Sequence, residues 1–130
     1  MNLLVLVVDD EPDVEALFRQ QFRREIRAGR FVMDFASSGV RAIQRIEQAE
    51  EGSLILLFSD INMPGMTGLE LLPHVRELLP DLPIIMITAY GDAATLRRAK
   101  EAGADDVYDK PIDFALLREE IDSRLAQAAS

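Results

Sequence analysis

A chain of 130 residues with 48% hydrophobic content is long enough to bury one substantial core, so we expect a single domain over residues 1–130. Its 23 acidic residues outnumber its 14 basic ones, and the formal net charge of −9 argues against direct binding to the phosphate backbone of DNA or RNA. There is no cysteine and His74 is the only histidine, which excludes disulfides and thiolate metal sites and leaves oxygen atoms to hold any metal ion.

No apolar run approaches the roughly 20 residues that span a bilayer. The start at Met1 also lacks the basic region and the small-residue cleavage site of a secretory signal. We therefore expect no membrane association and a cytoplasmic location.

The start of the chain predicts a strand, a helix and a second strand. The apolar run Leu3–Val8 is typical of a strand that is buried on both faces. Pro12 suits the first turn of a helix that we expect to continue to about Ala28, where Gly29 ends it. The side chains expected on the buried side of this helix are Val14, Leu17, Phe18, Phe22 and Ile26. The second predicted strand is Phe31–Ala36.

The middle of the chain predicts helix, strand and helix. The first helix follows Gly39, and its expected inward residues are Val40, Ile43, Ile46 and Ala49. The third strand is Leu54–Ser59, and the loop DINMPGMTG after it, Asp60–Gly68, is dense in turn residues. This loop continues into TGLE, whose capping-box spacing starts a helix at Gly68. Pro73 falls inside that helix and is expected to cause a kink or an early irregular turn there.

The last part of the chain predicts two more strands, each followed by a helix. Ile84–Thr88 is the fourth strand, and Asp92 caps a helix that continues to about Ala102. Gly103 stops this helix, and Asp106–Tyr108 forms a short fifth strand. The final helix is capped by Asp113 and is expected to turn Phe114, Leu117, Ile121 and Leu125 inward.

Five strands thus alternate with five helices, and hairpin signals are absent. This pattern predicts an α/β fold with a doubly wound parallel sheet that is covered on both faces. Ligands bind outside the carboxyl ends of the strands in such sheets. The polar residues expected at those ends are Asp9, Asp10, Asp60, Thr88 and Lys110.

This set of residues suits the formation of an acyl phosphate. The carboxylates of Asp9, Asp10 and Asp60 repel one another unless a cation is bound, and magnesium is commonly held by one or two carboxylates plus a phosphate. Lys110 adds a fixed positive charge and Thr88 a hydroxyl donor for phosphoryl oxygens. Asp60 is the best candidate nucleophile because it ends the middle strand beside an open Gly/Pro-rich loop. Asp9 and Asp10 are better placed as half of a metal site.

The chain resembles the receiver domains of two-component response regulators, of the single-domain chemotaxis-regulator type, over nearly its whole length. The matching segments are VVDDE (Val7–Glu11), SDINMPGMTG (Ser59–Gly68), ITA (Ile87–Ala89), GADD (Gly103–Asp106) and KP (Lys110–Pro111). The resemblance implies a flavodoxin-like, five-stranded sheet in the order 2-1-3-4-5. It also implies that Asp60 accepts a phosphoryl group from a sensor histidine kinase or a phosphotransfer protein, and that a conformational change then signals to a downstream protein.

The resemblance further implies a bound Mg²⁺ or Mn²⁺. Asp10, Asp60 and the backbone carbonyl of Asn62 would bind this ion directly, and Asp9 would support it largely through water. Apart from its own phosphorylation and dephosphorylation, such a domain catalyses no reaction.

The resemblance assigns the phosphoryl oxygens to Thr88 and Lys110, and it implies a cis peptide bond between Lys110 and Pro111. One position departs from the pattern: many receivers carry an aromatic residue three positions before the lysine, where this chain has Val107. Tyr108 is adjacent but should point to the opposite face of the sheet, so the usual aromatic switch is not expected.

The two residues that directly follow Thr88 are expected to control access to the phosphoryl group. Ala89 is small and leaves the site open. Tyr90, which borders the pocket, is expected to influence the lifetime of the phosphorylated state by controlling the entry of water.

Other functions compete with this interpretation. Asp9 and Asp10 could simply cap the helix that follows them. An aspartyl-phosphate phosphatase of the haloacid dehalogenase type would need an Asp-x-Asp motif after the first strand, which the segment Asp9–Pro12 does not supply. A receiver that has lost phosphorylation and serves as a scaffold is the third reading, and the intact acidic set weighs against it.

Two surfaces are candidates for protein partners. The basic run Arg19–Arg30 is most simply the solvated face of the first helix, and the sharper hypothesis is a kinase-docking surface that includes Arg23 and Arg27. Exposed residues of the fourth and fifth helices often form homodimer interfaces in this family, and Leu96, Arg97 and Arg118 are the candidates here, although these residues alone do not establish such an interface.

Overall fold

The five predicted strands form one parallel sheet in the order β2-β1-β3-β4-β5, which confirms the predicted fold class and strand order. The computed structural model describes residues 2–89 and 91–128. Its strands are β1 (Leu4–Val8), β2 (Val32–Ala36), β3 (Leu54–Asp60), β4 (Ile84–Thr88) and β5 (Asp106–Asp109). All residues of β1 and β4 are buried, as expected for strands with helices on both faces.

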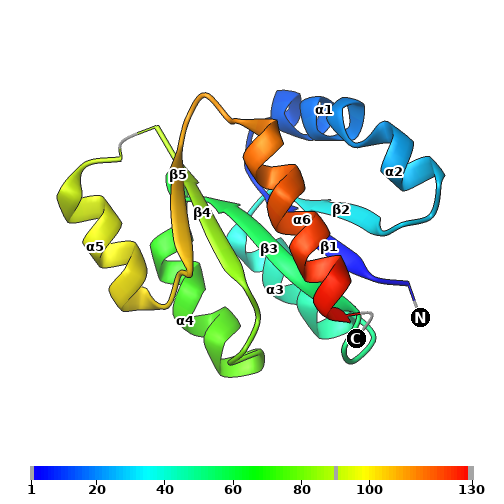
Figure 1. The fold of residues 1–130 in the computed structure, drawn as a ribbon. Coiled ribbons are helices and arrows are strands. Elements are labelled where there is room, and N and C mark those ends of the chain that lie inside the picture. Colours follow the sequence, from blue (N-terminus) through cyan, green and yellow to red (C-terminus); the bar gives the residue numbers. More distant parts are fainter. Residues whose placement is uncertain (1, 90, 129–130) are drawn as a thin grey trace.

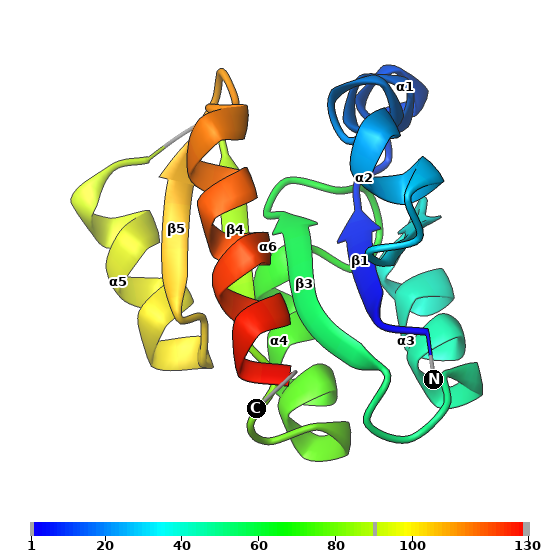
Figure 2. The ribbon, with the colours of Figure 1, turned by 45° about the vertical axis from the view of Figure 1, so that its right-hand side comes forward.

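Helices cover both faces of this sheet (Figures 1 and 2). They are α1 (Pro12–Gln21), α2 (Arg23–Arg27), α3 (Gly39–Gln48), α4 (Gly68–Leu78), α5 (Ala93–Ala102) and α6 (Phe114–Ala128). Residues of α3, α4 and α5 share one apolar cluster with strand residues such as Leu57 and Met86. Residues of α1 and α6 share a second cluster with Phe58 and Ile85 on the opposite face. The sheet therefore separates two hydrophobic cores.

The single helix predicted from Pro12 to Ala28 is wrong, because the structure divides it at Phe22, and residues 2–89 and 91–128 therefore contain six helices instead of five. Phe22 has φ −108° and ψ 17°, outside the helical range. Its fully buried ring packs near the rings of Phe18, Phe31 and Phe114, at centroid distances of 6.1–6.3 Å. Packing of this ring accounts for the break, a tertiary effect that helix periodicity does not encode.

Two residues predicted to face inward are exposed instead, namely Leu17 at 40% and Val40 at 55%. In α3 the buried stripe consists of Gly39, Ala42 and Ile46. Gly39 precedes Ile46 by seven residues, which is close to two full turns, so Gly39 lies on the same buried face as Ile46. Val40, the next residue, therefore points away from this face. Gly39 can do so because Met66 fills the space beside it.

The predicted caps are confirmed. Thr67 and Glu70 form a complete capping box at the start of α4, with both side chain to backbone distances at 3.2 Å. The Asp92 carboxylate accepts a hydrogen bond from the Thr95 N–H at 2.7 Å, and Asp113 accepts one from Ala115 at 3.0 Å. The α4 helix continues without interruption through Pro73.

An arginine that the sequence did not single out organises the amino end of β4 and β5. Arg76 of α4 donates hydrogen bonds to the carbonyl oxygens of Gly103 and Leu82 and to the carboxylate of Asp105 at 3.0 Å. The same Asp105 carboxylate accepts the Ile84 N–H at 2.7 Å. These bonds join α4 to the turns that precede both strands, and they explain why the GADD segment is polar at a position far from the carboxyl ends.

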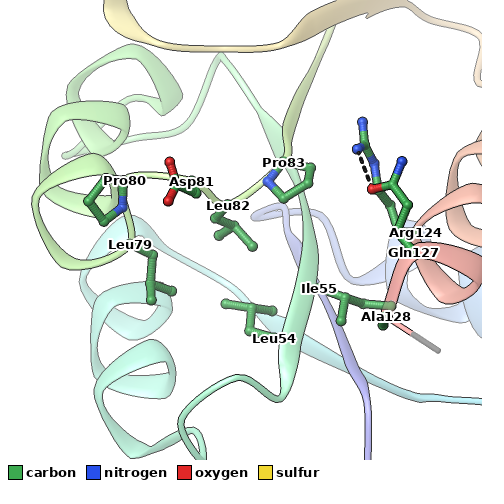
Figure 3. Close-up of a pocket in the computed structure, with 10 residues that line it drawn as sticks. All are labelled: Leu54, Ile55, Leu79, Pro80, Asp81, Leu82, Pro83, Arg124, Gln127 and Ala128. Atoms are coloured by element: carbon green, nitrogen blue, oxygen red, sulfur yellow. Dashed lines mark hydrogen bonds between the residues drawn. The ribbon is translucent and has the colours of Figure 1, made fainter. Parts of the chain in front are cut away.

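An open, largely apolar groove lies at the same amino end of the sheet (Figure 3). It is lined by the start of β3, by residues 79–83 between α4 and β4, and by the end of α6. The aspartates of the predicted site lie at the opposite end of the strands, so this groove is not part of that site. Within the described residues, no helix is long and apolar enough to cross a membrane.

Candidate functional site

Three aspartates meet at the carboxyl ends of β1 and β3. Val8 pairs with Ser59 in the sheet register, which brings Asp9 and Asp10 beside Asp60. Carboxylate oxygens from the three residues lie within 4.8 Å of one another. Asp60 is only 4% exposed, and Asp9 and Asp10 are half-buried. The convergence predicted from the strand ends is confirmed.

Lys110 reaches this cluster from the end of β5. Its Nζ lies 3.7 Å from Oδ2 of Asp9 and 3.7 Å from Oδ2 of Asp60. The peptide bond between Lys110 and Pro111 is cis, as the resemblance implied. The backbone N–H of Lys110 also donates to the Thr88 carbonyl oxygen at 2.8 Å, which places the ends of β4 and β5 side by side at the site.

The electrostatics of the cluster favour a bound cation. Burial and the neighbouring Asp9 carboxylate raise the pKa of Asp60 to about 6, against the opposing effect of Lys110. Burial also raises the pKa of Asp9, although the Glu11 N–H and Lys110 partly oppose this rise. One lysine is therefore not enough to offset the repulsion and desolvation of these carboxylates.

The donor set fits a hard divalent cation. All of the candidate ligands are oxygen atoms, which Mg²⁺ and Mn²⁺ prefer. Asn62 lies two residues after the end of β3, and its backbone nitrogen is 3.4 Å from Oδ1 of Asp60, so the backbone of Asn62 is next to the cluster.

The alternative that Asp9 and Asp10 only cap the following helix does not account for their positions. The N-cap residue of α1 is Glu11, and its own side chain makes no capping hydrogen bond. Oδ1 of Asp9 accepts the Glu11 N–H at 2.9 Å, and Oδ2 of the same residue faces Lys110. Asp9 thus supports the start of α1 and contributes to the acidic cluster at the same time.

Gly68 is a site-forming residue whose role was not apparent from the sequence. Its N–H donates to the Ile61 carbonyl oxygen at 2.8 Å, which brings the start of α4 against the end of β3. A Cβ at this position would overlap with the backbone oxygen of Asp60 and lie 2.9 Å from Cα of Ile61. The sequence feature that could have indicated this role is a glycine in the first turn of a helix that starts close to the candidate nucleophile.

The remaining predicted residues lie close to this edge. Thr88 ends β4 and is fully buried, and Ala89 after it is exposed. Tyr90, to which we assigned control of water entry, is outside the described residues.

Val107 and Tyr108 point to opposite faces of the sheet, as predicted. Val107 is buried in the cluster on the α3–α5 side. Tyr108 packs on the α6 side, where its hydroxyl donates to Glu120 at 3.4 Å. Burial, together with the nearby Glu120 carboxylate, raises the pKa of Tyr108 to about 12. No aromatic side chain of β5 therefore belongs to the cluster that contains Val107, within the described part of the chain.

Comparisons with known proteins agree with this geometry. The family model described as the response regulator receiver domain matches residues 5–122. The chain is 30% identical over 121 residues to sporulation initiation phosphotransferase F of Bacillus subtilis, covering 93% of this chain and 92% of that protein. It is 37% identical over 115 residues to the response regulator protein PilR of Pseudomonas aeruginosa, covering 88% of this chain but 24% of PilR.

The chain is also similar to a solved structure. That structure is a chain of the CheX–CheY–BeF₃–Mg²⁺ complex from Borrelia burgdorferi, with a TM-score of 0.80 and 28% identity, covering 93% of this chain and 87% of that one. Among the curated relatives, the chain spans nearly all of the sporulation protein, about a quarter of PilR and less than half of the response regulator MprA from mycobacteria.

Proposed function

We propose that this chain, which belongs to the family of response regulator receiver domains, accepts its phosphoryl group on Asp60 in a reaction that requires a divalent metal ion. Members of this family are signalling domains of two-component systems that are phosphorylated on aspartate. The observation that supports the choice of Asp60 is its position: it is the buried member of the acidic cluster and lies within 3.7 Å of Lys110.

Asp10, Asp60 and the backbone carbonyl of Asn62 would hold Mg²⁺ or Mn²⁺, and Asp9 would support the ion indirectly. The three clustered carboxylates and the raised pKa of Asp60 support this assignment. When bound, the ion neutralises charge on the phosphoryl oxygens and on the acidic cluster. With the ion bound, the Asp60 carboxylate would have a lower pKa and would stay in its nucleophilic, ionised form.

The chemical step is an in-line displacement at phosphorus. An Oδ atom of Asp60 forms the new P–O bond while the P–N bond of the donor phosphohistidine breaks, and the imidazole leaves. Lys110 and the Thr88 hydroxyl bind phosphoryl oxygens as charge develops on them. Ala89 leaves the approach open. Hydrolysis by water later returns Asp60 to its free form, and control of this water by Tyr90 stays a prediction.

We assign the phosphoryl donor to a histidine kinase or phosphotransfer protein and the output to a protein partner, with a cytoplasmic location. The exposed arginines of α1 and α2 support donor docking at that face, because Arg19, Arg23 and Arg27 line a shallow groove with Ile26. Charge reversal at Arg23 and Arg27 should slow phosphotransfer from the donor protein without affecting phosphorylation by acetyl phosphate. Reversal at Arg98, an exposed residue of α5, is the matched control, and equal phosphotransfer in both variants would contradict the docking assignment.

Intact-mass measurement after incubation with acetyl phosphate and Mg²⁺ tests the proposed function directly. We expect a gain of one phosphoryl group that disappears with EDTA and in Asp60→Asn. Asp81→Asn, an exposed carboxylate at the opposite end of the sheet, should retain the gain. Phosphorylation that persists in Asp60→Asn would refute the assignment. Size measurement with and without beryllofluoride and Mg²⁺ tests whether the activated chain dimerises.

A further inference from the structure

The carboxyl end of β2 also lies beside the acidic cluster. Val8 of β1 pairs with Ala36 of β2 in the sheet register, and the Asp9 N–H donates to the Ala36 carbonyl oxygen at 3.1 Å. Ser37 is the next residue along the chain, at the start of the loop between β2 and α3. The site residues predicted from the sequence did not include Ser37, although the topology places it at the same edge of the sheet as Asp9 and Asp10.

A small pocket connects Ser37 with the two aspartates of β1. Its volume is about 140 Å³, and it is lined by Asp9, Asp10, the first residues of α1 and residues 35–37. A cavity needs only about 10–15 Å³ to hold one water molecule, provided that polar partners are present. The pocket therefore has room for several water molecules directly beside the proposed metal ligands.

Two polar side chains of this pocket lack a protein partner. The Glu15 carboxylate is paired with Arg19 at 3.0 Å, and Asp9 accepts a backbone hydrogen bond and faces the lysine of the site. Within residues 2–89 and 91–128, neither the Asp10 carboxylate nor the Ser37 hydroxyl has a hydrogen-bond or ion-pair partner. These two groups can therefore bind whatever occupies the pocket.

The expected occupant is water that belongs to a divalent ion. Mg²⁺ prefers octahedral coordination and gives up its water ligands reluctantly, so it usually keeps several of them. The hydrogens of such water molecules need acceptors, and a serine hydroxyl carries two acceptor lone pairs. Groups that hold the ligands of a metal ion without touching the ion orient those ligands and increase the affinity for the metal.

We propose that Ser37 is a positioning residue for the metal ion, and that its hydroxyl accepts a hydrogen bond from a water ligand of Mg²⁺ on the Asp10 side of the site. Ser37 would thereby strengthen ion binding without contacting the ion itself. This inference rests on the proposed function, in which Asp10 and Asp60 hold the ion. If Ser37 were only a solvated loop residue, its hydroxyl would have no effect on the affinity for Mg²⁺.

Three variants isolate this hydroxyl. Ser37→Ala removes it, and Ser37→Thr retains it. Ser38→Ala is the matched control, because the neighbouring Ser38 caps α3 by accepting the Arg41 N–H at 3.2 Å and does not line the pocket. All three variants change only one small side chain in a loop or at a helix cap.

The first measurement is calorimetric titration of the metal-free protein with Mg²⁺. We expect binding to Ser37→Ala to be about three- to tenfold weaker, the range that corresponds to one hydrogen bond of ordinary strength. Ser37→Thr should bind Mg²⁺ nearly as tightly as the unmodified protein does. Ser38→Ala should bind it with unchanged affinity but have a lower thermal midpoint, because it loses a helix cap.

The second measurement is the rate of mass gain with acetyl phosphate at increasing Mg²⁺ concentrations. Ser37→Ala should need about three- to tenfold more Mg²⁺ to reach its half-maximal rate, and should reach the same maximal rate as the unmodified protein. A lower maximal rate at saturating Mg²⁺ would overturn the inference, since Ser37 would then affect the chemical step and not the binding of the ion.

The outcomes distinguish this inference from the function on which it rests. If the unmodified protein does not bind Mg²⁺, the proposed function is wrong and the role of Ser37 falls with it. If the unmodified protein binds Mg²⁺ and Ser37→Ala binds it equally well, the role of Ser37 alone is refuted. An equal loss of affinity in Ser37→Thr or in Ser38→Ala would also refute it, because the effect would then not depend on this hydroxyl.

Discussion

Replacing the buried nucleophile should stabilise the metal-free protein, and the size of the effect should depend on pH. Asp60 is 4% exposed, and its pKa rises from the ordinary value of 3.8 to about 6 because of burial and the carboxylate of Asp9. The folded protein therefore holds a proton on Asp60 more tightly than the unfolded chain does. Asp60→Asn keeps the shape of the side chain and removes the charge that burial disfavours.

The magnitude follows from the pKa difference. A difference of about two pH units corresponds to about 3 kcal/mol of unfolding free energy, since each pH unit is worth about 1.4 kcal/mol. The ionised Asp60 imposes this cost fully above about pH 6 and not at all below about pH 4. The pKa of about 6 already includes the attraction between Asp60 and Lys110, so we expect Asp60→Asn to be more stable by about 3 kcal/mol at pH 7.5.

Urea denaturation of the metal-free protein at pH 7.5, 6.0 and 4.5 tests this expectation. The advantage of Asp60→Asn should be largest at pH 7.5 and decrease as the pH falls through 6, because the unmodified protein then gains its proton. Asp81→Asn, which removes an exposed carboxylate at the far end of the sheet, should leave stability unchanged at every pH. Equal stabilities of Asp60→Asn and the unmodified protein at pH 7.5 would refute the electrostatic account of the cluster.

Saturating Mg²⁺ should make the unmodified protein more stable than Asp60→Asn, because the ion binds the native state of the unmodified protein and binds the variant much less. In a thermal-shift measurement, EDTA should abolish this stabilisation by Mg²⁺. Arg76→Ala should lower the unfolding free energy by about 2–4 kcal/mol, because it leaves part-buried carbonyl oxygens such as that of Gly103 without their donor. An unchanged midpoint in urea denaturation would show that these bonds are unimportant. Gly68→Ala should cost about 1–3 kcal/mol and slow the mass gain with acetyl phosphate, because its methyl group meets the backbone of the site; normal rates would contradict this close approach. Ser38→Ala should cost about 1 kcal/mol by removing the acceptor for the Arg41 N–H, without affecting phosphorylation.

Local sequence patterns determined most of the secondary structure and the identity of the candidate site. Continuous apolar runs marked the strands, and capping residues such as Thr67, Asp92 and Asp113 marked where helices begin. The alternation of strands and helices implied a parallel sheet, and that topology requires Asp9 and Asp60 to meet at one edge. These features were predictable because each depends on neighbouring residues or on a general rule of topology.

Tertiary packing decided what the local patterns left open. Burial of the Phe22 ring among other aromatic rings breaks the first helix, and the fit of Gly39 against Met66 turns Val40 outward. The roles of Gly68 and Arg76 each depend on a residue outside their own helix, which is Asp60 for Gly68 and Gly103 for Arg76.

The acidic cluster shows the same division between sequence and structure. The sequence by itself supplied the carboxylates, the lysine and their order along the chain. The raised pKa of Asp60 arises only when folding buries that carboxylate beside Asp9, with Lys110 3.7 Å from both. Both the distances between these charges and their exclusion from water are set by tertiary structure, and these determine the electrostatic energy of the site.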